Sequence, residues 1–412
     1  MMHTNRKFLK VSLIFLIFYI FTAGYYFNRV YQPWGTCDTD FSVFVRAAKS
    51  MAQKEDIYER SYLETGKDYY KYSPAFALSM IPLSKLHMHL SVPIWFLLIY
   101  IFFISSICLV KKLLEAENSK KILSKTFFFF AILMSLRFLL SVVQRVQSDC
   151  LVLILLAVFV FALFYRKDAS AGCALATATM VKLTPLIFLP YLILRKKFKA
   201  AAATLFFILL YLWLPALYLG TGKNMELIKS WFLVHKTNPA DYIYWFKNQS
   251  LLGATSRLLT KNTPVGLLDL DQATVNTIFI LVACILFALI FICLKQRGQQ
   301  DRPLYYLTDI SLVLICMILF SPLGWKHTFI HLLIPHMTLL YYLMYVDPKD
   351  KIIKALVIAS FFINTMLNPE LTGPFSKTIQ LYSNVTFGTL CLYAALLRMG
   401  CKYEDLGNHS HI

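Results

Sequence analysis

Charged residues are scarce in this chain of 412 residues: Asp, Glu, Lys and Arg make up 15% of it, whereas hydrophobic residues make up 58%. Soluble globular chains are about 45–50% apolar and about 25% charged. This contrast excludes an ordinary soluble enzyme and a disordered chain. The 9 cysteines include no C-x-x-C pair and most lie in apolar stretches, so the sequence indicates neither a zinc site nor a disulfide scaffold.

The motifs of several large enzyme classes are also absent. The sequence has no Walker A loop, no glycine pattern of a dinucleotide-binding turn, no G-x-S-x-G elbow and no H-E-x-x-H pair. Nucleotide hydrolysis, dinucleotide redox chemistry and serine hydrolysis are therefore unsupported, and we expect no cofactor.

Long apolar stretches recur along the chain, and a bilayer core of about 30 Å needs about 20 apolar residues per helix. The first stretch, 8–27, has no small-residue cleavage site, so we expect an uncleaved span rather than a signal peptide. Residues 170–194 form a short hairpin broken at 182–185. The pattern predicts an all-α polytopic membrane protein with about 11–13 transmembrane or re-entrant helices. The other predicted spans are 91–110, 126–142, 149–165, 199–219, 273–294, 304–320, 328–346, 352–366 and 378–398.

The basic surplus follows the membrane topology. With a cytoplasmic N-terminus and alternating spans, Lys and Arg are more than twice as dense in the inner segments as in the outer ones. The formal charge of +19 is therefore explained mostly by orientation in the plasma membrane. No basic patch with interleaved aromatic residues lies outside the membrane, so we expect no nucleic acid partner.

The two long segments between spans, 28–90 and 220–272, fall on the outer side of a single membrane domain that covers 1–412. From Asp40 onward, apolar residues recur at helical spacing. This predicts a helix that begins at Asp40 and lies with its apolar stripe on the membrane surface. Residues 74–86 are too short and too interrupted by proline to span, so we expect a re-entrant or interfacial piece.

Two carboxylates, Asp38 and Asp40, follow the first span. One interpretation is that Asp40 caps the following helix while Asp38 is solvated. The other is that one of them is a general base, since a carboxylate at the mouth of an apolar cavity can accept the proton of an attacking hydroxyl. The two roles are compatible because a cap fixes the position of the carboxylate.

Other polar side chains fall near the outer ends of spans, and a charge at the centre of a membrane-spanning helix costs about 2.5–3.5 kcal/mol on insertion scales. Arg145 and Gln147 lie between two spans with no room for a loop, and Arg145 can snorkel to the interface. Lys182 lies at the break of the hairpin, far from the basic inner loops. Broken helices at this depth line cavities, so Lys182 suits an anion such as a phosphate.

Two more clusters face the same leaflet. Asn248, Gln249 and Arg257 form one of them. In the other, His327 and His331 lie four residues apart, which is a metal-ligand spacing on a helix, but no acidic third ligand is near. We therefore expect no metal site and favour a phosphate contact for His327, with a purely structural role left open. One carboxylate with several cationic and amide groups fits group transfer from a lipid-linked phosphate.

An ordered set of short segments resembles glycosyltransferase family 87, whose members have the GT-C fold and use a polyprenol-phosphate sugar. The segments are Asp40–Ala48, Ile57-Tyr58, Tyr70–Pro74, Ile81–Leu83, Val146–Ser148, Ala174–Pro185, Arg195–Lys199, Asn248–Ser250 with Gly253 and Arg257, and Ser321–His327. The set spans nearly the whole chain in the family's order.

The resemblance implies a GT-C-type bundle and an inverting transfer of a sugar, mannose in the mannosyltransferases of the family, to a lipid or glycan hydroxyl outside the cytoplasm. It implies that Asp40 is the catalytic base, with Asp38 as second choice. It also implies that His327 lies near the donor phosphate and that Lys182 pairs with phosphate or sugar oxygens. The other expected substrate-binding residues are Tyr72, Arg145, Gln147, Asn248, Gln249, Arg257 and Trp325.

The alternative is a transporter or flippase of a lipid-linked sugar, because broken helices at membrane depth are typical of transporters. An inverted repeat would favour it, but the two halves show no convincing similarity. The long acidic first outer loop favours an enzyme instead. A non-catalytic assembly factor would be favoured only if the carboxylate were missing, and Asp40 is present.

Overall fold

The computed structural model describes residues 20, 22, 24, 39–58, 69–117, 122–234, 241–297 and 302–408. Within these residues every regular element is a helix, which confirms the predicted all-α class. The predicted first span, 8–27, lies almost wholly outside the described residues, and Asp38 lies outside them.

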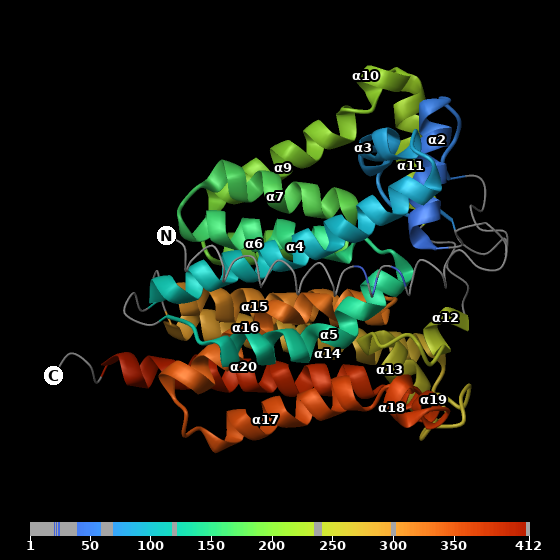
Figure 1. Cartoon of the computed structure of the whole chain (residues 1–412). Coiled ribbons are helices and arrows are strands. Elements are labelled where there is room, and N and C mark those ends of the chain that lie inside the picture. Colours follow the sequence, from blue (N-terminus) through green and yellow to red (C-terminus); the bar gives the residue numbers. More distant parts are fainter. Residues whose placement is uncertain are drawn as a thin grey trace.

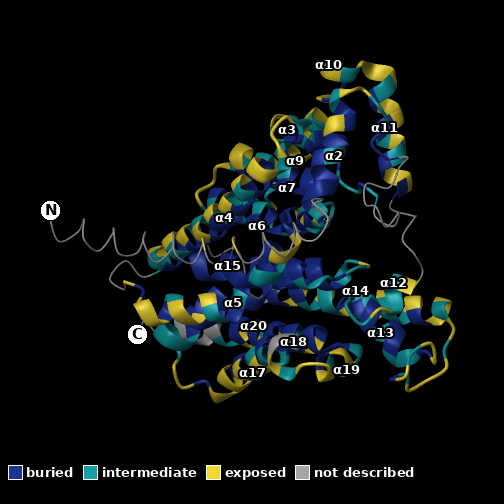
Figure 2. Ribbon diagram, turned by 45° about the vertical axis from the view of Figure 1, so that its right-hand side comes forward, coloured by how far each residue is buried: buried dark blue, intermediate teal, exposed yellow. Residues whose placement is uncertain are grey.

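Six helical stretches among the described residues are long and apolar enough to cross a bilayer, so the polytopic prediction is confirmed. They are α4 (Met88–Glu117), α5 (Lys125–Arg145), α9 (Phe198–Trp213) with α10 (Ala216–Leu219), most of α14 (Gln272–Arg297), α15 (Pro303–Phe320), and the run of η2 (Lys326–Leu332), α16 (Leu333–Tyr341) and η3 (Tyr342–Val346). In α15 every residue from Pro303 to Leu319 is buried, so this helix forms the centre of the bundle (Figure 2).

Further helices complete the bundle. They are α6 (Asp149–Phe164), α7 (Asp168–Val181), η1 (Thr184–Ile187), α8 (Phe188–Leu194), α17 (Lys351–Phe361), η4 (Phe362–Met366) and α20 (Asn384–Asn408). The break predicted at 182–185 is present: α7 ends at Val181, Lys182 is extended, and η1 begins the return. The helix pair α7 and α9 packs closely because Gly172 has no side chain; an added Cβ would lie 2.5 Å from the Cβ of Ala203.

The remaining helices gather at one end of the bundle, which we call the site end, at the right of Figure 1. They are α2 (Asp40–Ala52), α3 (Pro74–Ser84), α11 (Thr221–Val234), α12 (Asp241–Tyr244), α13 (Leu251–Leu259), α18 (Pro369–Thr372) and α19 (Phe375–Leu381). The end of α20 and the start of α17 lie at the opposite end. The segments predicted on the outer side thus share one end of the molecule.

Helix α2 differs from the sequence prediction in its surroundings. Its apolar stripe does not lie on a membrane surface, because Phe41, Phe44 and most of its other apolar residues are buried inside the protein. The rings of Phe41 and Phe44 lie 5.4 and 6.3 Å from the Trp95 ring of α4, measured between centroids. The aromatic contacts therefore fix α2 to the bundle and hold its first residue in place.

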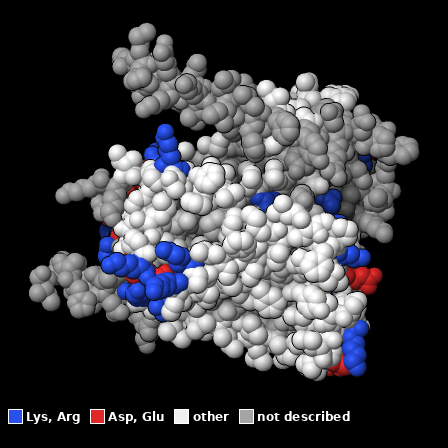
Figure 3. Space-filling model, turned by 60° about the horizontal axis from the view of Figure 1, so that its bottom comes forward, with Lys and Arg blue, Asp and Glu red and all other residues white. Residues whose placement is uncertain are grey.

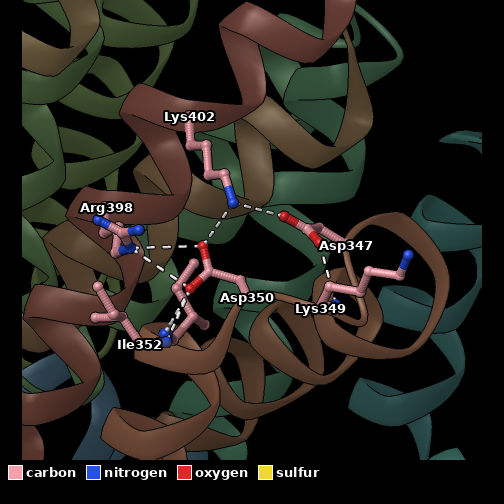
Figure 4. Close-up of polar contacts among 7 residues, drawn as sticks. Asp347, Lys349, Asp350, Ile352, Arg398 and Lys402 are labelled. Atoms are coloured by element: carbon pink, nitrogen blue, oxygen red, sulfur yellow. Dashed lines mark hydrogen bonds and ion pairs between the residues drawn. The ribbon is translucent and has the colours of Figure 1, made fainter.

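Charged side chains lie mainly at the two ends. Figure 3 shows a broad uncharged surface between a basic patch on one side and a few charged side chains on the other. At the opposite end, Lys402 of α20 donates hydrogen bonds to Asp347 at 2.7 Å and to Asp350 at 3.0 Å (Figure 4). Asp350 also caps α17 by accepting from the backbone N–H of Ile352 and Ile353. This cluster ties the start of α17 to the end of α20.

Candidate active site

A buried ion pair lies at the centre of the candidate site. Lys182 Nζ is 2.7 Å from Asp149 Oδ2, and the Asp149 side chain is 0% exposed. The geometry follows from two chain reversals: α5 ends at Val146 in a left-handed conformation, which places Asp149 at the start of α6, and α7 ends just before Lys182. The break in the hairpin is therefore fixed to the start of α6 by opposite charges.

His327 approaches the same carboxylate from η2. Its Nε2 atom is 3.9 Å from Asp149 Oδ2, and the ring is buried. His331 is also buried, with Nδ1 2.6 Å from the carbonyl oxygen of Thr328. The sequence predicted an α-helical face for these histidines, whereas the segment is a 3-10 helix. In the part of the chain that the structure describes, no group of His, Cys, Asp and Glu side chains has the geometry of a metal site.

Gln147 joins this centre to the first outer segment. The Tyr72 hydroxyl donates to Gln147 Oε1 at 3.3 Å, and the Trp95 ring N–H donates to the Gln147 carbonyl at 3.2 Å. The Gln147 side chain also accepts from the backbone N–H of Ser148, which fixes its rotamer. The tight turn between α5 and α6 is thus held from both α4 and the residues before α3.

Asp40 is the first residue of α2 and is half-buried, with Thr39 at the N-cap position. A carboxylate in the first turn is stabilised by the helix dipole. Burial raises the pKa of the Tyr72 hydroxyl, and the carboxylates of Asp40 and then Asp149 raise it further. The Phe44 ring of α2 lies 4.7 Å from the Tyr72 ring, measured between centroids, so the helix that begins at Asp40 packs against the residue that donates to Gln147.

Arg145 and Trp325 lie toward the surface of the site end. Arg145, the last residue of α5, is exposed, and its charge acts on Lys247. The pKa of Lys247 is lowered first by burial and then by Arg145. The Trp325 ring lies edge-on to Trp245, with 5.5 Å between the ring centroids.

Asn248, Gln249 and Arg257 are buried and hold the framework of the site end. Asn248 Oδ1 accepts from the backbone N–H of Gly324 at 2.9 Å, and its Nδ2 donates to Pro322. The Gln249 amide donates to the carbonyl of Gln380 and accepts from the backbone N–H at the start of α20.

The guanidinium of Arg257 donates to the carbonyls of Trp245 and Leu381 and to the hydroxyl of Ser383. Burial lowers the pKa of Arg257 to about 10, so the side chain remains charged at neutral pH. These three residues use their polar atoms on the protein itself, and a role for them in substrate binding stays a prediction.

The comparison with protein families decides the class of the chain. The family model for glycosyltransferase family 87 matches residues 70–322. The chain belongs to glycosyltransferase family 87. No curated protein and no solved structure matches it. As a family 87 protein with several membrane-spanning helices, it is a membrane glycosyltransferase. The matched range includes Tyr72, Gln147 and Lys182, whereas Asp40 and His327 lie outside it.

Two residues of this family 87 site were not singled out by the sequence. Asp149 is the first residue of the predicted span 149–165, yet only its neighbours Arg145 and Gln147 were assigned a role. A fully buried carboxylate needs a positive partner. The sequence placed Lys182 at the same membrane depth without naming a partner for it, so the Asp149–Lys182 pair could have been predicted. Lys247 directly precedes Asn248. No role was assigned to it from the sequence, and in the folded protein the charge of Arg145 lowers its pKa.

Proposed function

We propose that this family 87 protein transfers a hexose, mannose in particular, from a polyprenyl-phosphate donor to a hydroxyl of a lipid or glycan acceptor, with inversion at the anomeric carbon. The reaction is assigned to the extracytoplasmic face of the plasma membrane, with the N-terminus in the cytoplasm. The proposal is supported by family membership and by the chemistry that meets at the site end.

The proposed step needs one base and one set of cations. The carboxylate of Asp40 accepts the proton of the acceptor hydroxyl while the hydroxyl oxygen forms a bond to the anomeric carbon. The bond from that carbon to the phosphate oxygen breaks, and the polyprenyl phosphate leaves with the electron pair. Because the attack comes from the face opposite the leaving group, a β-linked donor gives an α-linked product.

The leaving phosphate gains negative charge in this step, and groups fixed around Asp149 lie close to its proposed position. Lys182 and His327 both approach Asp149, and Arg145 adds a further charge at the end of α5. Donors that are already oriented stabilise developing charge without reorganisation. The uncharged outer surface of the helices provides lipid contact for the polyprenyl tail (Figure 3).

The observation that carries the proposal is the packing of α2, which begins at Asp40, against Tyr72, whose hydroxyl donates to Gln147 in the turn before Asp149. To test it, the purified protein is incubated with radiolabelled polyprenyl-phosphate-mannose and a lipid extract. We expect label in a lipid or glycan product and release of polyprenyl phosphate. Movement of intact donor across a vesicle membrane without any transfer would instead establish the transporter alternative.

A further inference from the structure

Helix α11 lies against the first outer segment, although the two are far apart in the sequence. It packs against α3, and Figure 1 shows both helices at the site end. The buried residues of α11 recur at helical spacing and so form one face of the helix. They are Asn224, Leu227, Trp231 and Val234. One face of α11 is therefore available to hold the segment that begins with Asp40.

Trp231 binds the backbone of the first outer segment directly. Its ring N–H donates to the carbonyl oxygen of Lys71 at 3.1 Å, and its side chain is buried. A hydrogen bond of this kind restricts direction as well as distance, because it weakens steeply when donor and acceptor are misaligned. The position of α11 therefore determines where the backbone lies at Lys71, just before α3.

The residue after Lys71 connects this hydrogen bond to the centre of the site. The Tyr72 hydroxyl donates to Gln147 in the turn between α5 and α6. The Tyr72 ring lies 4.7 Å from the ring of Phe44, measured between centroids, and Phe44 lies one turn after Asp40 on α2. A shift of the backbone at Lys71 would therefore move Tyr72 against both α2 and the Gln147 turn.

The other end of α2 is held by α10, the helix just before α11. The Tyr218 hydroxyl of α10 donates to the carbonyl oxygen of Ala52, the last residue of α2, at 3.0 Å. The last carbonyls of a helix have no partner within the helix, so this hydroxyl satisfies one of them. The Lys54 ammonium also lies 5.6 Å from the centroid of the Tyr218 ring. Helices α10 and α11 thus bind the first outer segment at two separate points.

We propose that Trp231, supported by Tyr218, is a positioning residue that sets the orientation of α2 and hence of the Asp40 carboxylate toward the acceptor hydroxyl. This rests on the proposed function. A general base acts only within hydrogen-bond reach of the proton that it removes. A displacement of about 1 Å at the reacting atoms can lower the rate about a hundredfold. Helices α10 and α11 therefore contribute to the rate of transfer through α2, without contact with the reacting atoms.

The experiment compares variants of the full chain in nanodiscs that each lose one hydrogen bond. W231F removes the ring N–H and keeps an aromatic ring, and Y218F removes only the hydroxyl. With polyprenyl-phosphate-mannose as donor, we expect W231F to lower the kcat of transfer about tenfold to a hundredfold. Y218F should lower it less, because Tyr218 is exposed. The KM for the donor and the unfolding temperature should change little in both variants.

Two matched variants separate positioning from a general loss of stability. Y244F removes a hydroxyl of the second outer segment that donates to Gln272 at 2.6 Å, away from the first outer segment. W213F changes an exposed tryptophan at the end of α9. We expect both variants to transfer sugar at the parental rate. A fall in kcat in Y244F equal to that in W231F would overturn the proposal, as would a W231F variant in which only the donor KM is raised.

Amide hydrogen exchange tests the same contact without sugar transfer. In W231F we expect faster exchange in peptides that cover α2 and the start of α3, and parental exchange in α13 and α20. Faster exchange throughout the chain would show a general loss of stability and would overturn the proposal.

The two readouts distinguish the positioning role from the proposed function. If the parent transfers sugar and W231F transfers it at the parental rate, the proposed function stands and the positioning role is wrong. If exchange rises only in α2 and α3 but the parent never transfers a sugar, the proposed function fails while the hold of α11 on the first outer segment is confirmed.

Discussion

Lys182 and Asp149 join the break between α7 and η1 to the first residue of α6 through a 2.7 Å ion pair. The carboxylate is fully buried and His327 lies 3.9 Å from the same oxygen. Because charges in such surroundings are costly to separate, this pair determines both the shape of the hairpin and the polar environment of the site.

The first prediction concerns this pair. Lys182→Met leaves a buried carboxylate without its positive partner, and we expect it to lower the free energy of unfolding by about 3–5 kcal/mol. The double variant Lys182→Met with Asp149→Leu removes both charges and should regain most of the thermal stability in detergent, while donor turnover stays low. Lys111→Met, which removes an exposed pair with Glu115, is the control and should change stability little. Equal stability of the single variant and the control would contradict the assignment.

The second prediction asks whether Arg257 stabilises the protein or contacts the substrate. Removing its charge in Arg257→Gln breaks the bonds to Trp245, Leu381 and Ser383, so we expect a loss of about 2–4 kcal/mol of stability. The unfolding temperature should fall equally with and without a bound donor. A variant of parental stability whose KM for the donor alone is raised would show that Arg257 contacts the substrate.

The third prediction concerns the close approach of two loops at the site end. Gly324→Ala places a Cβ 2.6 Å from the backbone nitrogen of Ser250, which is shorter than any ordinary contact. The Gly324 loop must then separate from Asn248, whose side chain accepts from its N–H. We expect a marked fall in both unfolding temperature and transfer rate, whereas Gly222→Ala, with open space around the added carbon, should resemble the parent. Parental behaviour of Gly324→Ala would show that the loops are not in contact.

The fourth prediction is a pH dependence at the opposite end of the bundle. The hydrogen bond from Lys402 lowers the pKa of Asp347. Burial alone would raise the pKa of Asp350, but its bonds to the backbone N–H of Ile353 and to Lys402 lower it overall. Both carboxylates also raise the pKa of the Lys402 ammonium.

A lowered carboxyl pKa stabilises the fold above the unfolded value of about 4 and loses its effect as the pH falls through the folded value. The raised pKa of Lys402 has its full effect below the unfolded value of about 10.4 and loses it at higher pH. Lys402→Gln should therefore lower the unfolding temperature between about pH 4 and pH 10, with a smaller difference outside that range. Because the Lys402 side chain is partly exposed, the effect should be about 0.2–1 kcal/mol. A difference that persists unchanged at pH 3 would contradict this account.

The sequence predicted the break in the hairpin and the start of the helix at Asp40, because both depend on residues that are neighbours in the chain. The hairpin breaks at Lys182, which is extended. Pro185 follows near the start of η1, and because proline has no backbone N–H it does not fit inside a continuing α-helix. The helix that begins at Asp40 was predicted from its apolar spacing, but its membrane-surface position was wrong. The same spacing suits a lipid surface and a protein interior, and only the contacts with Trp95 distinguish them.

The sequence predicted several residues of the candidate site, but it did not predict which of them contact each other. Lys182 and His327 were expected near a phosphate, but their common neighbour Asp149 comes from another helix and pairing across helices depends on tertiary packing. Asn248, Gln249 and Arg257 were expected at the substrate because polar residues at membrane depth are usually functional. Their hydrogen bonds within the protein show that packing of irregular loops also requires buried polar groups.

The central claim is that Asp40 removes the proton from the acceptor hydroxyl, and Asp40→Asn tests it most directly. The variant keeps the size of the side chain at the start of α2 and removes its basicity. The purified variant and the parent are compared for transfer of labelled sugar from polyprenyl-phosphate-mannose, with donor binding and unfolding temperature measured on the same samples. We expect transfer to fall by about three orders of magnitude or more, consistent with loss of a general base, while binding and stability are retained. Transfer at the parental rate would contradict the account.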